Sequence, residues 1–567
     1  MPLMGSFYVG TSGLQTSQNA LNTTAHNLSN IETTGYVRQQ TLLGDRFYNN
    51  VGTAAISKQQ VGLGVEYSKV RQVRDAFLDK SYRKESGRSS FYDICFETTS
   101  EMETLLGELE GASFSNALTN FWTSVEELKK DPTSAVVQGQ FVTNAAQFLE
   151  RAQAVYDGLY RFQDNLNSRV IDQVNQINEY GNLIHKYNLA IQKAEAGSEE
   201  ANDLRDARNL ALDKLSALGN ITYSENLDGM VEVSFEGTQF VMRDMVFEMG
   251  VKIDTASGFS NPVWPHNENA PVFSNLDREV SSALETDVGE LRAILLARGD
   301  RRANYTDLLT DRTIDGQIFD VYRDGYLKDT TNPRAGRYMA TSKSLCLTVE
   351  AEFDQMIHSI VTEINNILTG EKKAIDGGIL PQYDDSPDQK MELFVRLGTP
   401  RYKKVTVGGD TKYQYVTEDT ENSPADVSTM YTTNNLKINP DLLKTPTALS
   451  FLTDDNKADQ AKADALADAF SAEFSALNPD TTKKYKYKDF YSAMLSQIGN
   501  AGGVYKSISK SQEETVASLE DSRQAVMGVS SNEELTNMIK FQNAYNASSR
   551  YINVVNEMLA TIIERLG

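Results

Sequence analysis

The two ends of the chain carry narrow apolar stripes at regular intervals. Over the first 30 residues, apolar side chains recur every seven positions, at Phe7, Leu14, Leu21 and Leu28. This spacing places them along one face of a helix roughly 38 Å long. No Asp, Glu, Lys or Arg precedes Glu32, and Ser, Thr, Asn and Gln fill 14 of the first 30 positions. A helix with so little apolar surface is marginal alone, so the pattern predicts a packing partner.

The last 30 residues carry a second stripe, with intervals that alternate between three and four. Its positions are Met538, Phe541, Tyr545, Ser548, Ile552, Val555, Leu559, Ile562 and Leu566. This heptad seam is typical of a coiled coil, although an ordinary terminal helix of a globular core is an alternative. Since neither stripe can be buried alone, we expect the two ends to meet in one stalk. The predicted assembly interface consists of Phe7, Leu14, Leu21, Leu28, Met538, Phe541, Tyr545, Ile552, Val555, Leu559, Ile562 and Leu566.

Between the stripes the pattern is mostly helical, with two β-prone blocks. Apolar residues at helical spacing, uninterrupted by proline, predict one helix over 141–194, about 80 Å long. Short β-prone runs separated by glycine turns fall within 219–285 and 385–440, including a hairpin turn at Gly408-Gly409. Shorter helices are expected at about 91–110, 114–130, 201–218, 286–298, 345–369, 455–475 and 503–527.

The fold class that follows is mainly α with a β-rich insert. We expect an elongated multidomain protein with a coiled-coil stalk, a helical bundle domain and a β-rich outer domain. The expected divisions are 1–40 with 530–567 for the terminal coiled coil; 41–218 with 286–300, 341–370 and 450–529 for a helical rod domain; and 219–285 with 371–449 for the β-rich outer domain. The pattern does not place 301–340, which we treat as an insert.

Composition limits the possible partners. The 567 residues hold 78 Asp and Glu against 55 Lys and Arg, which gives a net charge of −23. Such a chain repels phosphate backbones unless it has a local basic patch. The sequence shows no cluster of Lys and Arg of that kind, so we expect no nucleic-acid partner. No run of 18 apolar residues occurs, and the first stripe lacks basic residues on its polar face, so we expect no membrane partner.

Candidate chemistry is sparse. Two cysteines, Cys95 and Cys346, exclude a disulfide scaffold; two separate core thiols are favoured over one bridge. The four histidines have no ligand spacing, and no phosphate-binding loop or nucleophile–base pattern is present. The acidic stretch 454–459 lacks the glycine and glutamate of a calcium loop and fits a solvated helix start. We therefore expect no enzyme, cofactor or metal, and the information in the periodicities points to assembly.

Both terminal stripes lie in segments that resemble a known family. The segment GLQTSQNALNTTAHNLSNIETTGYVRQ (13–39) resembles the N-terminal motif of bacterial flagellar rod, hook and hook-associated proteins, and 532–562 resembles their C-terminal motif. The chain departs from the family at His26, where Asn is usual, at Thr34, where Pro is common, and at Ser531-Asn532, where Leu-Asp is usual. The segments 105–134, 203–218 and 289–300 are similar to the hook-associated protein 1 family, which forms the hook–filament junction.

The resemblance implies a role and a set of partners. Members of this family form a ring of identical subunits between hook and filament, on which the filament assembles. The implied partners are other copies of the chain, the hook protein, the next hook-associated protein on the filament side, and a cytosolic export chaperone that holds the C-terminal segment. The implied location is extracellular, at the hook–filament junction, after export through the flagellar type III apparatus.

Two other interpretations stay open at this point. Within the same family the chain could be a hook or distal-rod protein, although the 105–134 and 203–218 segments favour the junction. A secreted enzyme with catalysis in the β-rich insert is the alternative from another class. The role of that insert, the number of subunits in a ring and the oxidation state of the cysteines are not fixed by the sequence.

Overall fold

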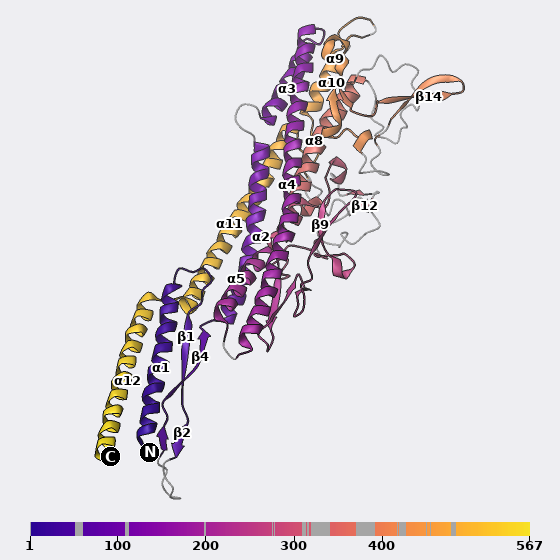
Figure 1. Cartoon of the computed structure of the whole chain (residues 1–567). Helices are drawn as coiled ribbons and strands as arrows, with labels where there is room; N and C mark the ends of the chain where they lie inside the picture. Colours follow the sequence, from indigo (N-terminus) through magenta and orange to yellow (C-terminus); the bar gives the residue numbers. More distant parts are fainter. Residues whose placement is uncertain are drawn as a thin grey trace.

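The computed structural model shows an elongated molecule in which both termini lie at the same end (Figure 1). The structure describes residues 2–50, 60–107, 113–197, 200–274, 276, 278–308, 313–314, 317–318, 341–369, 392–416, 418, 427–449, 451–453, 455–477 and 483–566. Most of the predicted insert 301–340, and much of 371–449, therefore lie outside the described residues.

The terminal helices lie side by side and form a stalk. Helix α1 (Pro2–Ser29) runs along α12 (Ser531–Leu566), as the two stripes predicted. On its other side α1 packs against a long antiparallel hairpin. This hairpin comprises β1 (Gln39–Asp45), β2 (Tyr48–Asn50), β3 (Gln60–Gly62) and β4 (Val65–Gln72).

The hairpin occupies the first part of 41–218, the segment assigned to the helical rod domain, where the sequence pattern predicted no strand. Its strands pair β1 with β4 and β2 with β3, and the register shifts between Leu42 and Leu43. Both faces of β4 carry polar residues, and every side chain of β4 is at least partly exposed. A strand that packs on one uncharged helix needs little apolar alternation, so its sequence signal is weak.

A bundle of helices forms the body of the molecule. The helices are α2 (Ala76–Gly107), α3 (Phe114–Lys130), α4 (Ala135–Glu195), α5 (Asn202–Leu218), α6 (Glu290–Arg298), α8 (Leu345–Thr369), α9 (Pro440–Lys444), α10 (Gln460–Ser471) and α11 (Tyr487–Met527). At 1.5 Å per residue the 61 residues of α4 span about 90 Å. Asp459 caps α10 by accepting a hydrogen bond from the Lys462 amide, which confirms the predicted helix start.

Two helices begin well before their predicted starts. Helix α2 begins at Ala76 instead of about 91, and α11 begins at Tyr487 instead of about 503. Glycine and serine near these points weaken the local helix signal. Helix packing overrides it: α11 lies along α2, and a Cβ on Gly502 would lie 3.3 Å from Thr99 Oγ1.

The strands form small antiparallel sheets on the side of the body. They are β5 (Ile221–Glu225), β6 (Val231–Phe235), β7 (Thr238–Val241), β8 (Gly250–Ile253), β9 (Ser260–Trp264), β10 (Ala270–Pro271), β11 (Thr313–Ile314), β12 (Gln317–Ile318), β13 (Phe394–Arg396), β14 (Tyr402–Val407), β15 (Asp410–Tyr415) and β16 (Leu436–Ile438). Gly408 and Gly409 both have positive φ and join β14 to β15, which confirms the predicted hairpin turn.

One hydrophobic core runs from the helices into the strands. The same cluster of buried residues includes Phe148 of α4, Phe235 of β6, Phe353 of α8 and Phe394 of β13. The β-rich blocks are thus packed on the helical body and share its core. Both cysteines are free thiols, as predicted, and Cys346 is buried.

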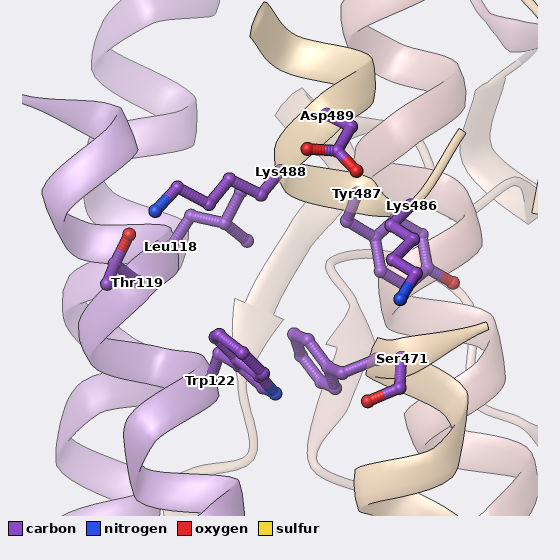
Figure 2. A pocket seen from close by; sticks show the side chains of 9 residues that line it. Leu118, Thr119, Trp122, Ser471, Lys486, Tyr487, Lys488 and Asp489 are labelled. Carbon is purple, nitrogen blue, oxygen red and sulfur yellow. The ribbon is translucent and has the colours of Figure 1, made fainter. Parts of the chain in front are cut away.

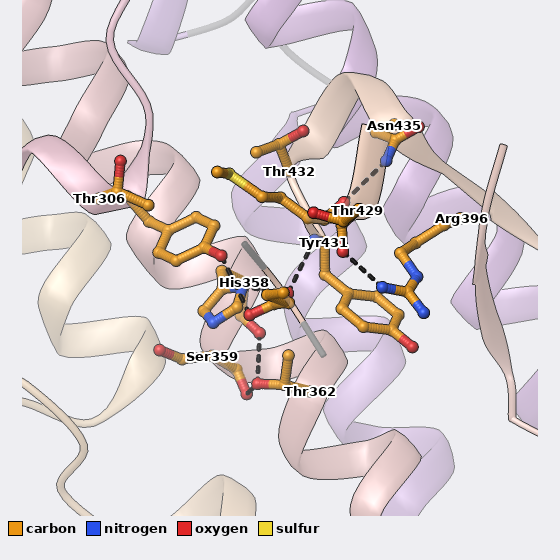
Figure 3. Close-up of polar contacts among 12 residues, drawn as sticks. Thr306, His358, Ser359, Thr362, Arg396, Thr429, Tyr431, Thr432 and Asn435 are labelled. Atoms are coloured by element: carbon orange, nitrogen blue, oxygen red, sulfur yellow. Dashed lines mark hydrogen bonds and ion pairs between the residues drawn. The ribbon is translucent and has the colours of Figure 1, made fainter. Parts of the chain in front are cut away.

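Polar contacts attach the second β-rich block to α8 (Figure 3). Asp354 on α8 accepts hydrogen bonds from the Thr433 amide at 2.7 Å and from the Tyr305 amide at 3.0 Å. The His358 ring stacks on Tyr305, with ring centroids 3.7 Å apart. Arg396 donates to the Thr429 carbonyl oxygen. These contacts fix the turns on both sides of α8.

Candidate assembly interface

Helix α1 satisfies its own hydroxyl groups. Thr16 Oγ1 donates to the Ser12 carbonyl oxygen at 2.7 Å, and Thr24 Oγ1 donates to the Ala20 carbonyl oxygen at 2.9 Å. A hydroxyl bonded within its own helix can be buried without a partner elsewhere. The buried positions of α1 are accordingly small or hydroxylated: Gly10, Ser12, Thr16, Ser17, Ala20, Thr24 and Asn27.

Small residues let α1 approach α12 closely. A Cβ on Gly10 would lie 2.6 Å from Ile552 Cγ1, and one on Gly13 would lie 2.7 Å from Ser548 Oγ. No real Cβ approaches that closely, so a larger residue at either position would force the helices apart. The contact surface of α1 is therefore its small residues as well as its leucines.

The predicted interface residues lie along the contact but are incompletely buried. Val555 is 2% exposed, whereas Phe7, Leu14, Leu21, Leu28, Met538, Phe541, Tyr545, Ile552 and Leu559 are half-buried. Ile562 is exposed, and the side chain of Leu566 lies outside the described residues. The register places the seam toward α1, but a single pair of helices does not cover it.

Helix α12 also carries a second set of large apolar side chains that are exposed in the described part of the chain. Its large members lie beside the seam or beyond it, with Ile539 60% exposed and Ile563 70% exposed. The full set is Leu535, Ile539, Tyr551, Val554, Met558, Ile562 and Ile563. Together with the half-buried seam, these side chains leave α12 with apolar surface that a neighbouring molecule can cover.

A polar joint connects the stalk to the body. Buried Asn27 uses all of its hydrogen-bonding capacity there: Nδ2 donates to the Gln39 carbonyl oxygen at 2.9 Å and to Glu534 Oε2 at 3.2 Å. Its Oδ1 accepts from Tyr36 Oη at 2.8 Å and from the Gln39 amide at 3.0 Å. One side chain thus ties α1 to the hairpin and to the first turn of α12.

Charged groups complete the joint. Arg38 Nε lies 3.0 Å from Glu534 Oε1, and Arg38 Nη1 lies 2.8 Å from Glu533 Oε2. On α5, Asp206 accepts from the Val37 amide at 3.1 Å and from Gln72 Nε2 at 2.7 Å. Burial raises the pKa of Asp206 to about 7, against the lowering effect of these donors and of Arg74. These contacts fix the stalk to the lower end of the body.

Comparison with known proteins matches both terminal helices and a large part of the helical body. The model of the family described as flagellar hook-associated protein FlgK helical domain matches residues 99–313. The flagella basal body rod protein model matches 7–36, and the flagellar basal body rod FlgEFG protein C-terminal model matches 524–565. The two terminal matches cover most of α1 and α12.

Full-length relatives agree with these matches. Flagellar hook-associated protein 1 of Bacillus subtilis (strain 168) is 24% identical over 98% of this chain and 96% of its own length. Those of Escherichia coli (strain K12) and Salmonella typhimurium are 23% and 22% identical over 97% of this chain and 98% of theirs. The chain belongs to the flagellar hook-associated protein 1 family. The flagellar hook junction protein FlgK from Burkholderia pseudomallei aligns with a TM-score of 0.48 at 12% identity, over 80% of this chain and 100% of that one.

Membership of the hook-associated protein 1 family makes this chain a structural protein of the flagellum, in a family not known for enzymes. It also explains why the N-L-S-N…T-G-Y motif is recognisable. Asn27 and Tyr36 of that motif form the joint, and Gly35 provides a φ of +81° beside Leu210. His26, a departure from the usual motif, keeps a place in the network through a 3.0 Å contact between Nδ1 and Tyr36 Oη.

Sequence reasoning did not find the joint residues of this family member. The apolar stripes identified α1 and α12, whereas Asn27, Arg38, Asp206 and Glu534 have no periodic pattern. A buried carboxylate such as Glu534 looks like any other surface glutamate in the sequence. The available signal was the motif itself, since its polar residues sit where α1 ends and the hairpin begins.

The helical body also buries several carboxyl groups, and their contacts show what these groups do. Glu350, Glu352 and Asp354 lie within five residues of α8 and are all buried. Glu350 accepts from the Ala303 amide at 2.9 Å, as Asp354 does from Thr433, so both hold backbone turns. Among described residues, no group of three or more His, Cys, Asp or Glu is placed to hold a metal ion, and no helix is long and apolar enough to cross a bilayer.

Proposed function

We propose that this chain is the subunit of the ring that joins the flagellar hook to the filament and gives the filament its assembly platform. Similarity to the hook-associated protein 1 relatives over 97–98% of the chain supports this. The observation that carries the proposal is the apolar surface that α12 leaves exposed, together with its half-buried seam. A stalk whose seam is incompletely buried in the single chain can be completed by neighbouring copies.

The partners follow from an asymmetric subunit. Copies packed head to tail around a tube present different surfaces above and below. The hook protein would contact one side of the ring and the next hook-associated protein the other. Before assembly, the apolar face of α12 needs cover in the cytosol, which is the proposed task of an export chaperone.

Export through the flagellar type III apparatus fits the uncharged, hydroxyl-rich sequence of α1. The first 31 residues carry no side-chain charge, and their hydroxyls need no partner on another element. Such a segment can travel unfolded and then fold when the apolar face of a neighbour becomes available. The proposed location is therefore extracellular, at the junction between hook and filament.

Complementation tests the proposal and its closest alternative together. We would express the chain in a bacterium that lacks its own hook-associated protein 1, then label it with gold-tagged antibody for electron microscopy. We expect label at the hook tip and filaments beyond it. Label along the hook shaft or the rod would instead favour a hook or distal-rod protein. Filaments that form without any label at the junction would contradict the proposal.

A further inference from the structure

A small apolar pocket lies at the end of the body opposite the stalk. It has a volume of about 160 Å³ and is bounded by α3, the end of α10 and the start of α11 (Figures 1 and 2). Leu118, Phe470 and Tyr487 are buried and form its apolar wall. Trp122 stands at its edge, 39% exposed, and Figure 2 shows it facing the pocket together with Thr119.

The pocket has the size of one large side chain. Cavities of about 150 Å³ lined by apolar residues accept a benzene molecule, so this one can accept an aromatic ring or a branched aliphatic group. Its wall is held in place by ring contacts: Tyr487 stacks on Phe474 at 4.4 Å and meets Phe470 edge-on at 5.7 Å. A rigid wall loses little conformational entropy when a ligand enters.

The pocket is lined by two lysines, Lys486 and Lys488, and by Asp489. Two more lysines, Lys483 and Lys484, precede them in the sequence, and all four lysines are exposed. No described carboxylate lies within ion-pair distance of them, although the chain as a whole carries a charge of −23. Helix α11 also begins at this rim without a side-chain cap at Lys486, so the positive end of its dipole adds to the lysine charge.

We propose that this pocket docks an acidic segment of another protein, with one aromatic or branched aliphatic side chain in the pocket and flanking carboxylates against the lysines. The inference goes beyond the proposed junction function and does not depend on it. Apolar anchors in a fitted pocket carry most of the energy of such contacts, while surrounding charge pairs favour the right partner.

A second copy of the chain fits the pocket less well. The most exposed large apolar residue on the described surface is Leu227, beside Glu225 and Asp228. Those two carboxylates already pair with Arg205 and Arg243, so little charge is left for the lysines. Leu227 also follows α5 near the far end of α4, so most of the length of that helix separates it from the pocket, and copies placed side by side would not bring the two ends together.

Nucleic acid is also disfavoured, although lysines and tyrosines alternate through 483–488. Stacking on bases needs exposed rings. Tyr487 is buried in the pocket wall and Tyr485 is half-buried. The acidic protein segment is therefore the occupant that the contacts favour.

Fluorine NMR on the full-length chain tests the proposal. The chain has two tryptophans, so 5-fluorotryptophan labelling gives two resonances, and Trp122→Phe identifies that of Trp122. The probe is the peptide acetyl-Glu-Asp-Phe-Asp-Glu-amide, compared with acetyl-Glu-Asp-Ala-Asp-Glu-amide, acetyl-Lys-Lys-Phe-Lys-Lys-amide and the oligonucleotide dT8. We expect the Phe peptide alone to shift the Trp122 resonance saturably, while the resonance of buried Trp264 stays in place.

Matched variants decide the role of the lysines. Lys486→Glu with Lys488→Glu should weaken peptide binding at least about tenfold, because attraction becomes repulsion. Lys252→Glu with Lys437→Glu changes the net charge equally at exposed sites elsewhere and should change little. An equal response to the Ala or Lys peptide would overturn the proposal. So would tighter binding of dT8, or a Trp122 shift that follows protein concentration without peptide, which would indicate a second copy.

Discussion

Helices α4 and α12 show the same kind of apolar pattern in the sequence. In the molecule, however, α4 buries its apolar face within the chain, whereas α12 leaves most of its apolar residues at least partly exposed. Helix α4 places buried residues at nearly every turn, from Gln138 to Ile191, against α3, α5, α6 and α8. Over its described side chains, α12 fully buries only Glu534 and Val555. A heptad pattern therefore tells which face of a helix is apolar. It does not tell whether the partner belongs to the same chain.

The two regions also handle polar groups in opposite ways. The body buries whole carboxylates, as at Glu350, Glu352 and Asp354 of α8, and surrounds some of them with backbone donors. In α1, charge is absent and buried hydroxyls bond to their own helix. A body that folds once can bury carboxyl groups among donors or in their protonated form, whereas α1 carries no Asp, Glu, Lys or Arg to desolvate.

The largest expected effect comes from placing a charge in the seam. Ile552→Asp would put a carboxylate against Gly10 of α1, where the helices touch. Burying it unpaired costs several kcal/mol in every subunit of a ring, so we expect assembly to be lost while the body stays folded. Circular dichroism of the monomer and electron microscopy of complemented cells would measure the two effects.

Asn553→Asp is the matched control for the seam. Asn553 is exposed and lies next to Ile552 on the same helix. A solvated carboxylate there should change little. Normal filaments with Ile552→Asp would refute the paired-helix interface. Equal damage from both changes would show that the outer face of α12 also packs tightly against neighbours.

A cavity made in the body should lower the stability of the single chain, in contrast to a charge in the seam, which should affect assembly alone. Phe148 of α4 is fully buried, with ring centroids 5.2 Å from Phe121 and 5.6 Å from Phe114. Phe148→Ala should lower the free energy of unfolding of the body by about 3–5 kcal/mol. Urea unfolding of the monomer, followed by circular dichroism, would report this as a lower midpoint.

Met558→Ala on α12 sharpens that contrast. Met558 is 52% exposed in the single chain, so its truncation should leave the unfolding midpoint of the monomer unchanged. The same change should weaken assembly, because the exposed side chain is apolar surface that a neighbouring subunit would cover. An unfolding midpoint that falls as far as with Phe148→Ala would mean that α12 is completed within one chain.

The sequence predicted the features that depend on apolar periodicity or turn chemistry better than those that depend on polar contacts. The seams of α1 and α12, the long α4 and the Gly408-Gly409 turn were all readable, because each depends on periodicity or on a glycine with positive φ. The hairpin over 39–72 was missed, since its strands pack on one thin helix and need few apolar residues. The joint was missed for another reason: Asn27 and Glu534 are 507 positions apart, and no local rule connects them.

The buried carboxyl groups of the body predict that its stability depends on pH. Burial raises the pKa of Glu352 to about 8 from an ordinary value of 4.5, although Gln497 Nε2 donates a hydrogen bond to Glu352 Oε1 at 3.3 Å. Between pH 4.5 and 8 the unfolded chain releases this proton and the folded chain keeps it. The folded state binds more protons, so stability falls as pH rises through this window.

Glu352→Gln removes that dependence, since the amide stays neutral. The variant should match the wild-type chain near pH 4.5 and gain stability relative to it as pH approaches 8, by on the order of a few kcal/mol. Thermal unfolding at pH 5 and pH 8 would show the difference. Glu513→Gln, on the exposed surface of α11, is the control and should give no such gain. A Glu352→Gln variant that loses stability equally at both pH values would show that the carboxylate is held charged by its neighbours.

The smallest expected effect concerns the joint between the two regions. Asn27→Asp keeps the acceptor for Tyr36 and for the Gln39 amide but removes both Nδ2 donors and faces the carboxylate of Glu534. We expect a local cost of about 1–3 kcal/mol, with the unfolding midpoint of the body unchanged. Hydrogen exchange should accelerate in 36–45 and at the start of α12, where the lost contacts lie. Asn22→Asp places the same charge on the same helix at an exposed position, so it should leave these amides protected. If Asn22→Asp accelerated them equally, the absence of charge from α1, and not the bonds of Asn27, would hold the stalk to the body.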